Sequence, residues 1–345
     1  MQCFGSGKTG GGMREISRLW LSLGTIALLM LLSVSVRAEM SVVIAVSKTP
    51  LSAPFYVAER EGFFKAEGLN VEVRECLGGH RCMKELLEGR ADFATCSDMV
   101  ITQQAALEKS FYVLSTFVTS ADDTQIVVRR GAGIENPSDM VSKRIGYVKG
   151  SASHYFADIF LLLGGADPQN NTFVELQPEQ MPDALYKGEV DVIAIWQPWS
   201  YLALKKSGNN AFVMNELKPY TVTFNLIGQV NLIDNNPQLA VRLLRSLVRA
   251  EQFILQDGEF VKEIVEEHTG MNGKVLDAIW PSYQFHVSLT QQFLLTLQNE
   301  YYWLKQQDPH GQKYKKDALD FRDYVMPELL QQLDITRVHL NQPPE

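Results

Sequence analysis

The chain has 345 residues, which is long enough to form two lobes with hydrophobic cores of ordinary size. Hydrophobic residues make up 46% of the sequence and charged residues 21%, a composition typical of globular rather than disordered proteins. The formal net charge of −8 excludes the basic surface that nucleic-acid-binding proteins carry, so we expect no nucleic-acid partner.

The N-terminal segment has the order of a secretory signal peptide. Arg14 and Arg18 precede an apolar run from Leu19 to Leu32, and Val36-Arg37-Ala38 offers small residues at a cleavage point. The run is short for a membrane-spanning helix, and no later segment is long and apolar enough to span a bilayer. We therefore expect a signal peptide over residues 1–38 and a mature chain in the periplasm, without a membrane span.

The start of translation has two candidates. Met1 is followed by a Gly-rich stretch, and Met13 stands directly before the charged part of the expected signal peptide. The sequence does not choose between them.

A strand, a tight turn and a helix form the most informative local pattern. The apolar, β-branched run 42–47 predicts a buried strand. A turn that contains Pro50 and Ser52 leads into a helix over 54–63, which begins with Pro54. Gly68 separates this helix from a second strand over 69–75, which completes a βαβ unit. Its turn lies at the carboxyl end of a strand, where open α/β sheets bind ligands. The free N–H groups that begin such a helix can bind an anion.

The rest of the chain divides into two similar halves and a helical C-terminal region. Segments 89–94 and 188–194 both carry a Gly, a charged residue, an Asp and an apolar strand, which predicts two lobes of one kind. We expect further strands at 91–95, 111–118, 126–129, 144–148, 172–176 and 190–195, and helices at 81–89, 98–107, 151–163, 181–186, 237–255, 290–304 and 316–333.

Three cysteines remain beyond residue 38, namely Cys76, Cys82 and Cys96. In an oxidising compartment Cys76 and Cys82 could form a disulfide across a short loop and leave Cys96 over. The alternative is three reduced and mostly buried thiols. Cys76, His80 and Cys82 do not have the spacing of a standard zinc site, so we expect no metal.

Several motifs resemble those of one family. The segments that carry the resemblance are 54–58, 62–64, 68–69, 87–94, 150–156 and 195–199. Together they resemble the periplasmic substrate-binding proteins of the nitrate/sulfonate/taurine class, a group that also contains thiamine-pyrimidine binders. The resemblance covers residues 41–230 well and the C-terminal helices only generally.

The resemblance implies an α/β fold with two lobes, the type II periplasmic binding protein fold, with hinge strands and a helical C-terminal extension. Lobe I would comprise residues 39–122 and 223–345, and lobe II residues 123–222. The ligand of this family lies in the cleft between the lobes, and its members deliver solute to the permease of an ABC transporter. We expect a monomer that needs no cofactor.

Candidate ligand contacts lie where strands end and helices begin. They are Ser52, Pro54, Phe55, Tyr56, Ser97, Asp98 and Thr116 in the first half, Ser151, Ser153, His154, Trp196 and Gln197 in the second, and Asn225 near the return crossover. The first loop is included because the family places it against ligand; alternatively, it is a tight turn with Phe55 in the core. Trp196 could form a wall of the cleft and Gln197 could hydrogen-bond the ligand, unless the tryptophan belongs to the core.

Two helix beginnings bear on the charge of the ligand. Ser151 and Ser153, with the N–H groups beside them, could hold an anion, and an ordinary N-cap there does not exclude such binding. His154 could donate to an oxyanion or could be structural. A carboxylate from Asp98 in the cleft would repel an anion but could hold an amine, as in an aminosulfonate; pure capping by Asp98 is the alternative.

The expected function is therefore the capture of a small oxyanion, of the sulfonate, taurine or nitrate class. The alternatives are a binding protein for a thiamine-precursor pyrimidine and a partner of a membrane signalling protein. An enzyme is not expected, because the sequence lacks the nucleophile elbow, metalloprotease and phosphate-loop motifs. Asp122 and Asp123 are adjacent carboxylates that point to opposite faces of an extended chain, so they are interpreted as hinge residues and not as an acid/base pair.

Overall fold

The computed structural model describes residues 1–5, 39–214, 216–218, 220–308 and 310–340. The charged and apolar parts of the expected signal peptide lie outside these residues. The chain from Met40 onward forms one compact unit, which is the unit described below. None of the helices in the described part of the chain has both the length and the apolar character needed to cross a membrane.

The larger of two sheets has seven strands in the order β12-β11-β4-β10-β3-β1-β2. Their bounds are Met40–Ser47 (β1), Leu69–Cys76 (β2), Phe93–Ser97 (β3), Tyr112–Ser120 (β4), Val222–Gly228 (β10), Tyr283–Thr290 (β11) and Val338–His339 (β12). β1 is parallel to both β2 and β3, as expected for successive βαβ units. β10 lies antiparallel between β3 and β4, so a late segment of the chain completes the middle of this sheet.

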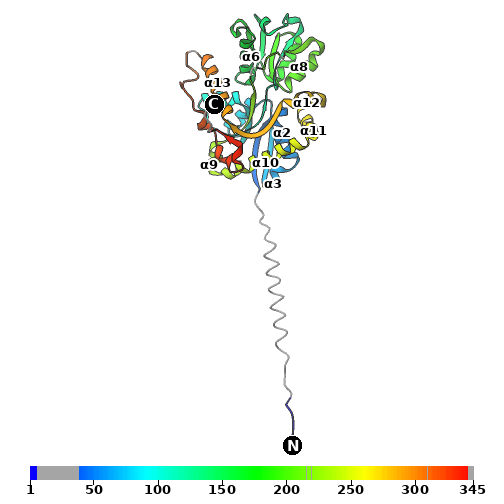
Figure 1. Cartoon of the computed structure of the whole chain (residues 1–345), viewed down its shortest axis with the longest axis vertical. Coiled ribbons are helices and arrows are strands. Elements are labelled where there is room, and N and C mark those ends of the chain that lie inside the picture. The colour runs from blue at the N-terminus through cyan, green and yellow to red at the C-terminus, as the bar shows by residue number, and fades with distance from the viewer. Residues whose placement is uncertain (6–38, 215, 219, 309, 341–345) are drawn as a thin grey trace. The chain divides into compact units, whose positions relative to one another are not determined.

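The smaller sheet has five strands in the order β7-β6-β8-β5-β9. They are Thr124–Arg129 (β5), Arg144–Tyr147 (β6), Thr172–Glu175 (β7), Val192–Trp196 (β8) and Ala211–Met214 (β9). β6 is parallel to β7 and β8, while β5 is antiparallel to β8 and β9. The chain passes from the larger to the smaller sheet between β4 and β5 and returns between β9 and β10. Figure 1 shows the smaller sheet in green at one end of this unit, with the larger sheet below it.

Helices cover both sheets. Those of the first half are Ala53–Arg60 (α2), Phe63–Ala66 (α3), Gly79–Leu87 (α4) and Asp98–Ala106 (α5), and those packed on the smaller sheet are Ala152–Leu163 (α6), Met181–Lys187 (α7) and Trp199–Ser207 (α8). The remaining helices are Val230–Asn235 (α9), Pro237–Gln256 (α10), Gly258–Thr269 (α11), Gly273–Ile279 (α12), Gln291–Gln306 (α13) and Pro327–Gln331 (α14). α10 buries Leu239, Leu243 and Leu247 on one face, and this face packs against α2 and β11.

One expected helix is wrong. The segment 316–333 forms a 3-10 turn at Phe321–Tyr324 and the five-residue helix α14, with extended chain between them. Pro327 explains the break, because proline has no N–H to donate and fits the first turn of a helix rather than its interior. Five apolar residues of this segment do become buried, so the pattern indicated burial and not the type of element; they are Leu319, Phe321, Val325, Leu329 and Leu330.

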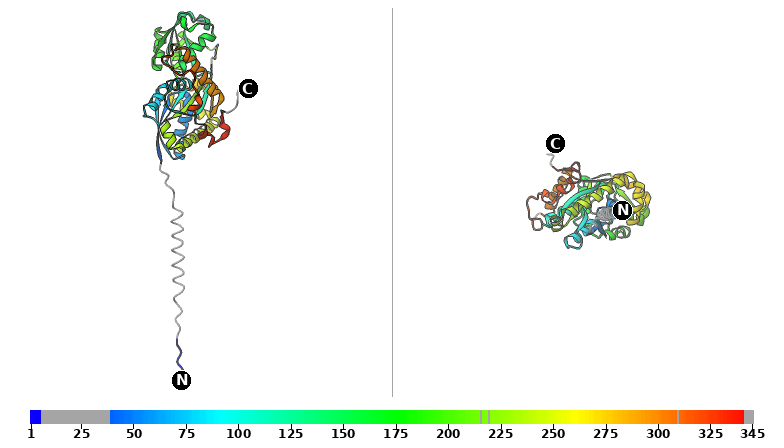
Figure 2. Two further views of the ribbon diagram at one scale, coloured as in Figure 1. Left: turned by 90° about the vertical axis from the view of Figure 1, so that its left-hand side faces the viewer. Right: turned by 90° about the horizontal axis from the view of Figure 1, so that it is seen from below.

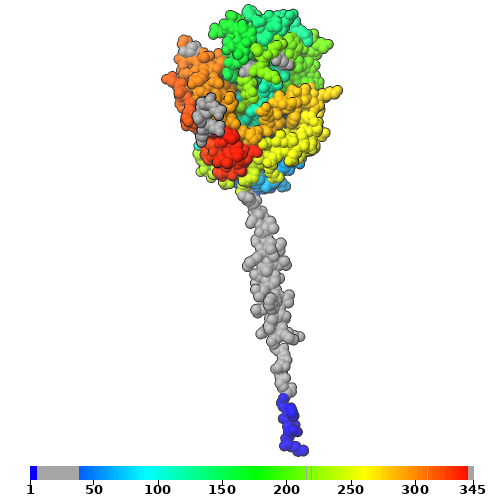
Figure 3. All heavy atoms as spheres, viewed as in Figure 1, coloured from blue at the N-terminus to red at the C-terminus, as the bar shows by residue number. Residues whose placement is uncertain are grey.

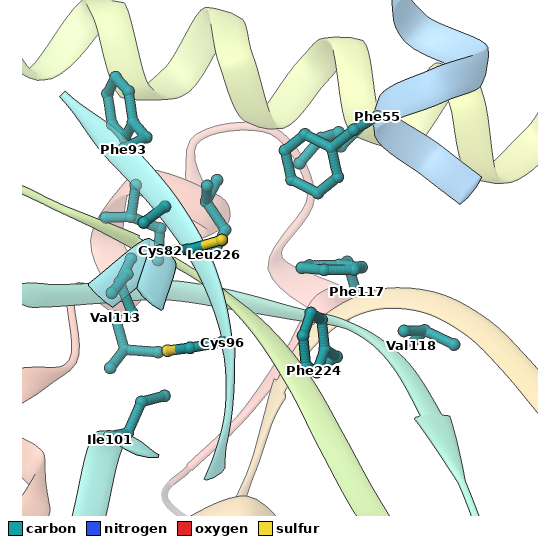
Figure 4. Packing of buried hydrophobic residues seen from close by; sticks show 14 of the residues in the cluster. Phe55, Cys82, Phe93, Cys96, Ile101, Val113, Phe117, Val118, Phe224 and Leu226 are labelled. Carbon is teal, nitrogen blue, oxygen red and sulfur yellow. The ribbon is translucent and has the colours of Figure 1, made fainter. Parts of the chain in front are cut away.

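Aromatic rings join the larger sheet to its helices. The ring of Phe117 on β4 lies between those of Phe55 on α2 and Phe224 on β10, with centroid distances of 5.0 and 5.8 Å (Figure 4). Both contacts are edge-to-face, the geometry that such rings prefer, and each contributes about 0.5–1.5 kcal/mol beyond burial of area. Phe55 is therefore a core residue of the first βαβ unit.

The three cysteines beyond residue 38 are free thiols. Cys82 and Cys96 are fully buried in the same core, as Figure 4 shows, and Cys76 is nearly so. Cys76 and Cys82 are not joined by a disulfide in this structure, so the pairing considered from the sequence is absent. Burial raises the pKa of the Cys82 and Cys96 thiols, which keeps both protonated and unreactive.

Candidate functional site

A cavity lies between the two sheets, with about 370 Å³ of unfilled space when its part open to solvent is included. From the larger sheet and its helices it is lined by Ser47, Thr49, Leu51, Gly79, His80, Ser97, Val100, Val222 and Phe224. From the smaller sheet and the crossing into it come Asp123, Thr124, Ser151, Ala152 and Trp196.

The loop after β1 reaches this cavity through Ser47, Thr49 and Leu51. Behind them, the hydroxyls of Ser52 and Tyr56 both donate to the Ser47 carbonyl, at 2.6 and 3.2 Å. These two hydroxyls are thus used to hold the loop. Pro54 and Phe55 belong to α2 and are buried. Ser47, whose carbonyl accepts both bonds, lines the cavity. The four residues predicted from this loop do not line it; they are Ser52, Pro54, Phe55 and Tyr56.

At the start of α5 only one of the two predicted residues lines the cavity. Ser97 does so, but the Asp98 carboxylate turns inward and accepts the N–H groups of Met99 and Thr223 at 2.9 and 2.8 Å. Burial raises the pKa of Asp98 to about 7. The Asp98 carboxylate, which the sequence analysis placed in the cleft, therefore does not line the cavity.

Thr116 and Asn225 also lie behind the cavity. The Thr116 hydroxyl donates to Oδ1 of Asn225 at 2.7 Å, and the amide of Asn225 donates to the hydroxyl of Thr223 at 3.0 Å. Their polar groups bond to one another between β4 and β10. Thr116 lines a separate pocket beside Tyr155 and Tyr220, and neither Thr116 nor Asn225 lines the cavity described above.

The loop before α6 contributes Ser151 and Ala152 to the lining. The Ser151 hydroxyl donates to the Val148 carbonyl and accepts the N–H of Ser153, at 2.8 and 3.2 Å. The Ser153 hydroxyl donates to the Ala194 carbonyl at 2.6 Å, which fixes the loop on β8. The N–H groups of Ser153 and His154 also bond to Ser151. The N–H of Ala152 is therefore the first-turn donor that this loop can offer to a solute.

His154 lies outside the cavity. Its ring packs between those of Tyr147 and Trp303, with centroid distances of 4.5 and 4.8 Å. Burial lowers the pKa of His154 to about 4, so the imidazole is neutral at physiological pH. A structural role explains its position.

At the end of β8, Trp196 lines the cavity and Gln197 does not. The Gln197 side chain bonds Gln125 and the N–H of Tyr201, both at 3.3 Å. The Trp196 ring packs edge-to-face against that of His80, which also lines the cavity, with ring centroids 6.3 Å apart. Gly78 makes room for this pair: its φ is +109°, and a Cβ there would lie 3.0 Å from the Trp196 ring.

The cavity combines one carboxyl group with neutral groups. Burial raises the pKa of Asp123 to about 7, and the hydrogen bond from Tyr283, at 3.1 Å, opposes this shift. Burial also lowers the pKa of His80 to about 4, and no lysine or arginine is among the lining residues. Sequence reasoning singled out Asp123 as a hinge residue and His80 only as a rejected metal ligand; it missed both as parts of the cavity.

Contacts outside the cavity also join the two sheets. Arg81 on α4 donates to Gln177 and Glu179 at 2.9 and 2.8 Å. On another side, Trp303 and Gln307 at the end of α13 donate to the Asp158 carboxylate on α6, at 2.7 and 2.9 Å. Figure 2 shows α13 as the orange helix that runs beside the larger sheet toward the green smaller one, and Figure 3 shows orange and green atoms bordering each other there.

Two α/β sheets linked by two chain crossings, with a cavity lined by both, define the periplasmic binding protein fold. The alkanesulfonate-binding protein SsuA from Xanthomonas axonopodis pv. citri, solved bound to MOPS, has this fold: the TM-score is 0.69 at 18% identity, over 84% of this chain and 99% of that one. The periplasmic nitrate-binding protein NrtA from Synechocystis PCC 6803 is similar with a TM-score of 0.69 at 14% identity, over 87% of this chain and 89% of that one.

The chain belongs to the family described as NMT1/THI5 like, which it matches over residues 49–259. Among curated relatives, the "Putative aliphatic sulfonates-binding protein" of Bacillus subtilis (strain 168) is 22% identical over 66% of this chain and 70% of its own length. The taurine-binding periplasmic protein of Escherichia coli (strain K12) is 26% identical over 45% of this chain and 48% of its own length.

The relatives also include an enzyme. The 4-amino-5-hydroxymethyl-2-methylpyrimidine phosphate synthase of Legionella pneumophila (strain Philadelphia 1) is 23% identical over 46% of this chain, and the match covers 49% of the enzyme's length. The chain thus spans about half of the taurine-binding and synthase relatives. The binding proteins among these relatives support a solute-binding role for this chain and leave its solute class open.

Proposed function

We propose that this chain is a solute-binding receptor outside the cytoplasm, which captures a small oxyanion-type solute and delivers it to the permease of an ABC transporter. In this proposal residues 39–122 and 223–345 form lobe I and residues 123–222 form lobe II. The lobes close on the solute because only the closed form lets it contact both at once. The receptor acts as a monomer and catalyses no reaction.

The observation that carries this proposal is the meeting of three helix beginnings at one cavity. α4 contributes Gly79 and His80, α5 begins directly after Ser97, and α6 contributes Ala152. The N–H groups of Gly79, His80 and Ala152 have no hydrogen-bond partner among the described residues, whereas the Met99 N–H of α5 bonds to Asp98. The helix dipole makes each of these helix beginnings positive. A hydrogen bond from such a group to an anion contributes on the order of 1.5–3 kcal/mol.

A proline substitution tests these N–H groups directly. Ala152 is the first residue of α6, where proline is well tolerated, and Ser151 before it has the extended conformation that a following proline requires. Ala152→Pro removes one N–H from the cavity without breaking a hydrogen bond of the helix. We expect the affinity for an anionic solute to fall about tenfold or more, since one charge-assisted hydrogen bond is lost.

Gln291→Pro is the matched control. Gln291 is the first residue of α13, its N-cap Thr290 has φ −123° and ψ 155°, and Ser151 has φ −124° and ψ 174°. Gln291 does not line the cavity. Isothermal titration of the purified chain with ethanesulfonate, taurine and nitrate is the measurement. Binding of none of these anions, or equal affinities for Ala152→Pro and Gln291→Pro, would refute the proposal.

A second candidate is a binding protein for a thiamine-precursor pyrimidine. The aromatic rings of Trp196 and His80 on the cavity lining, together with the match to a pyrimidine phosphate synthase, favour it. Such a solute would lie flat against Trp196 and bond the polar groups around it. Thermal stabilisation of the protein by 4-amino-5-hydroxymethyl-2-methylpyrimidine, without stabilisation by any of the three anions, would select this candidate.

A further inference from the structure

Asp123 and Thr124 stand where the chain enters the smaller sheet, and both line the cavity. Asp123 is 3% exposed and Thr124 is 5% exposed. Oδ1 of Asp123 accepts the hydroxyl of Tyr283 at 3.1 Å, while Oδ2 accepts no hydrogen bond from any residue that the structure describes. The Thr124 hydroxyl is buried and likewise has no partner among those residues.

The neighbouring Asp122 has a different environment. Its carboxylate is partly exposed and pairs with Lys218 at 2.7 Å, away from the cavity lining. The two adjacent carboxylates thus point in different directions, as expected for an extended chain. Of these two aspartates, Asp123 lines the cavity and Asp122 does not, so Asp122 is available as a control.

A buried carboxylate ordinarily has a cation or several donors around it, because an unpaired buried charge is costly. The cavity lining provides no lysine or arginine, and His80 is neutral. One hydroxyl, that of Tyr283, is the only donor to the Asp123 side chain from the described part of the chain. A donor that satisfies Oδ2 and the Thr124 hydroxyl would therefore have to come from the solute.

The helix beginnings demand the opposite charge in the same cavity. α4, α5 and α6 have between 9 and 12 residues each, and their positive ends favour an anionic group. A simple alkanesulfonate or nitrate would satisfy these ends but has no donor for Oδ2 of Asp123, which would have to take up a proton beside the anion. A solute with both charges would satisfy both parts of the cavity.

Resting on the proposed function, we propose that the solute is a small zwitterion, with its anionic group at the helix beginnings and a protonated amine at Oδ2 of Asp123 and the Thr124 hydroxyl. Asp123 is then the residue that determines specificity for aminated over simple oxyanions. The amine donates to both oxygens, and Tyr283 holds the carboxylate in position through Oδ1.

Three sulfonates of similar size test this inference. Taurine carries an ammonium group, isethionate a hydroxyl and ethanesulfonate a methyl group at the same end. We expect the wild-type chain to bind taurine at least about tenfold more tightly than ethanesulfonate, because a hydrogen-bonded charge pair is gained. Asp123→Asn retains an acceptor for Tyr283 and should remove this preference, while Thr124→Val should reduce it. Asp122→Asn should retain it.

The outcomes separate the two proposals. If ethanesulfonate binds as tightly as taurine, or if Asp123→Asn keeps the wild-type preference, the zwitterion inference is wrong and the oxyanion receptor stands. If none of the three sulfonates binds, this inference fails together with the sulfonate form of the proposed function. Circular dichroism and the melting temperature of Asp123→Asn establish that a lost preference does not come from unfolding.

Discussion

The contact between α13 and α6 should control how readily the cavity closes. Trp303 and Gln307 both donate to Asp158, which is 6% exposed, and so they tie a helix beside the larger sheet to a helix on the smaller one. Separation of the two sheets by rotation about the crossings must break these bonds. Trp303→Phe removes the indole N–H and keeps an aromatic ring against His154 and Tyr155.

The expected effect follows from the lost bond. A hydrogen bond to a charged group contributes about 1.5–3 kcal/mol, which corresponds to roughly tenfold to hundredfold in an equilibrium constant. If the bond exists only in the closed form, its loss reduces the equilibrium constant between the closed and open forms by this factor. Where the open form predominates without solute, the dissociation constant rises by the same factor, because only the closed form binds fully.

Calorimetric titration with solute and the melting temperature of the ligand-free chain together test whether the contact stabilises only the closed form. We expect Trp303→Phe to bind its solute at least about tenfold more weakly, with a small change in melting temperature. Trp280→Phe serves as the control, since Trp280 packs on Tyr283 and Phe285, away from α6. A lower melting temperature with unchanged affinity would mean that the contact persists in both forms, and the reasoning about closure would be wrong.

Three further predictions concern the cavity and the core. Gly78→Ala should abolish binding and lower the melting temperature, because φ of +109° strains a residue with a Cβ by about 1–3 kcal/mol and this Cβ meets Trp196; normal affinity would contradict this. Burial raises the pKa of Asp123 from its ordinary 3.8 to about 7, so its contribution to stability is greatest below about pH 4 and is lost as the pH rises to about 7. Asp123→Asn should remove this part of the pH dependence in urea titrations of the ligand-free chain, and parallel curves for both proteins would count against it. The third prediction concerns the buried free thiols of Cys76, Cys82 and Cys96. Without reductant, all three should be unreactive toward a thiol reagent in the folded protein and reactive after unfolding. If only one of the three reacts after unfolding, the other two form a disulfide.

The fold was largely predictable because its signals are local. The β-branched run before residue 48 became β1, and the two segments with a Gly, a charge and an Asp became the entries to β3 and β8. The failure at 316–333 shows the limit of periodicity, since Pro327 divides an apolar pattern that is buried without being one helix. The position of β10 between β3 and β4 depends on distant pairing, which no local pattern expresses.

The candidate site was predictable only in part. Ser97 and Trp196 end β3 and β8, Ser151 is the N-cap of α6, and all three line the cavity, as ligand contacts at such positions would. Ser52, Ser153 and Gln197 have the same sequence context, but their polar groups bond to the backbone or to neighbouring side chains. Which of two adjacent polar residues faces a cavity depends on tertiary packing. For the same reason Asp123 and His80 could not be placed there from the sequence.

The insertion of β10 has a consequence for how the chain matures. β3 and β4 gain their shared neighbour only when residues 222–228 arrive, and β4 gains its other neighbour only with residues 283–290. During synthesis the larger sheet therefore stays incomplete until most of the polypeptide has left the ribosome, and such long-range pairing is slow. A nascent chain with this topology cannot complete the pairing of β4 before residues 283–290 are available, so its larger sheet forms late in synthesis.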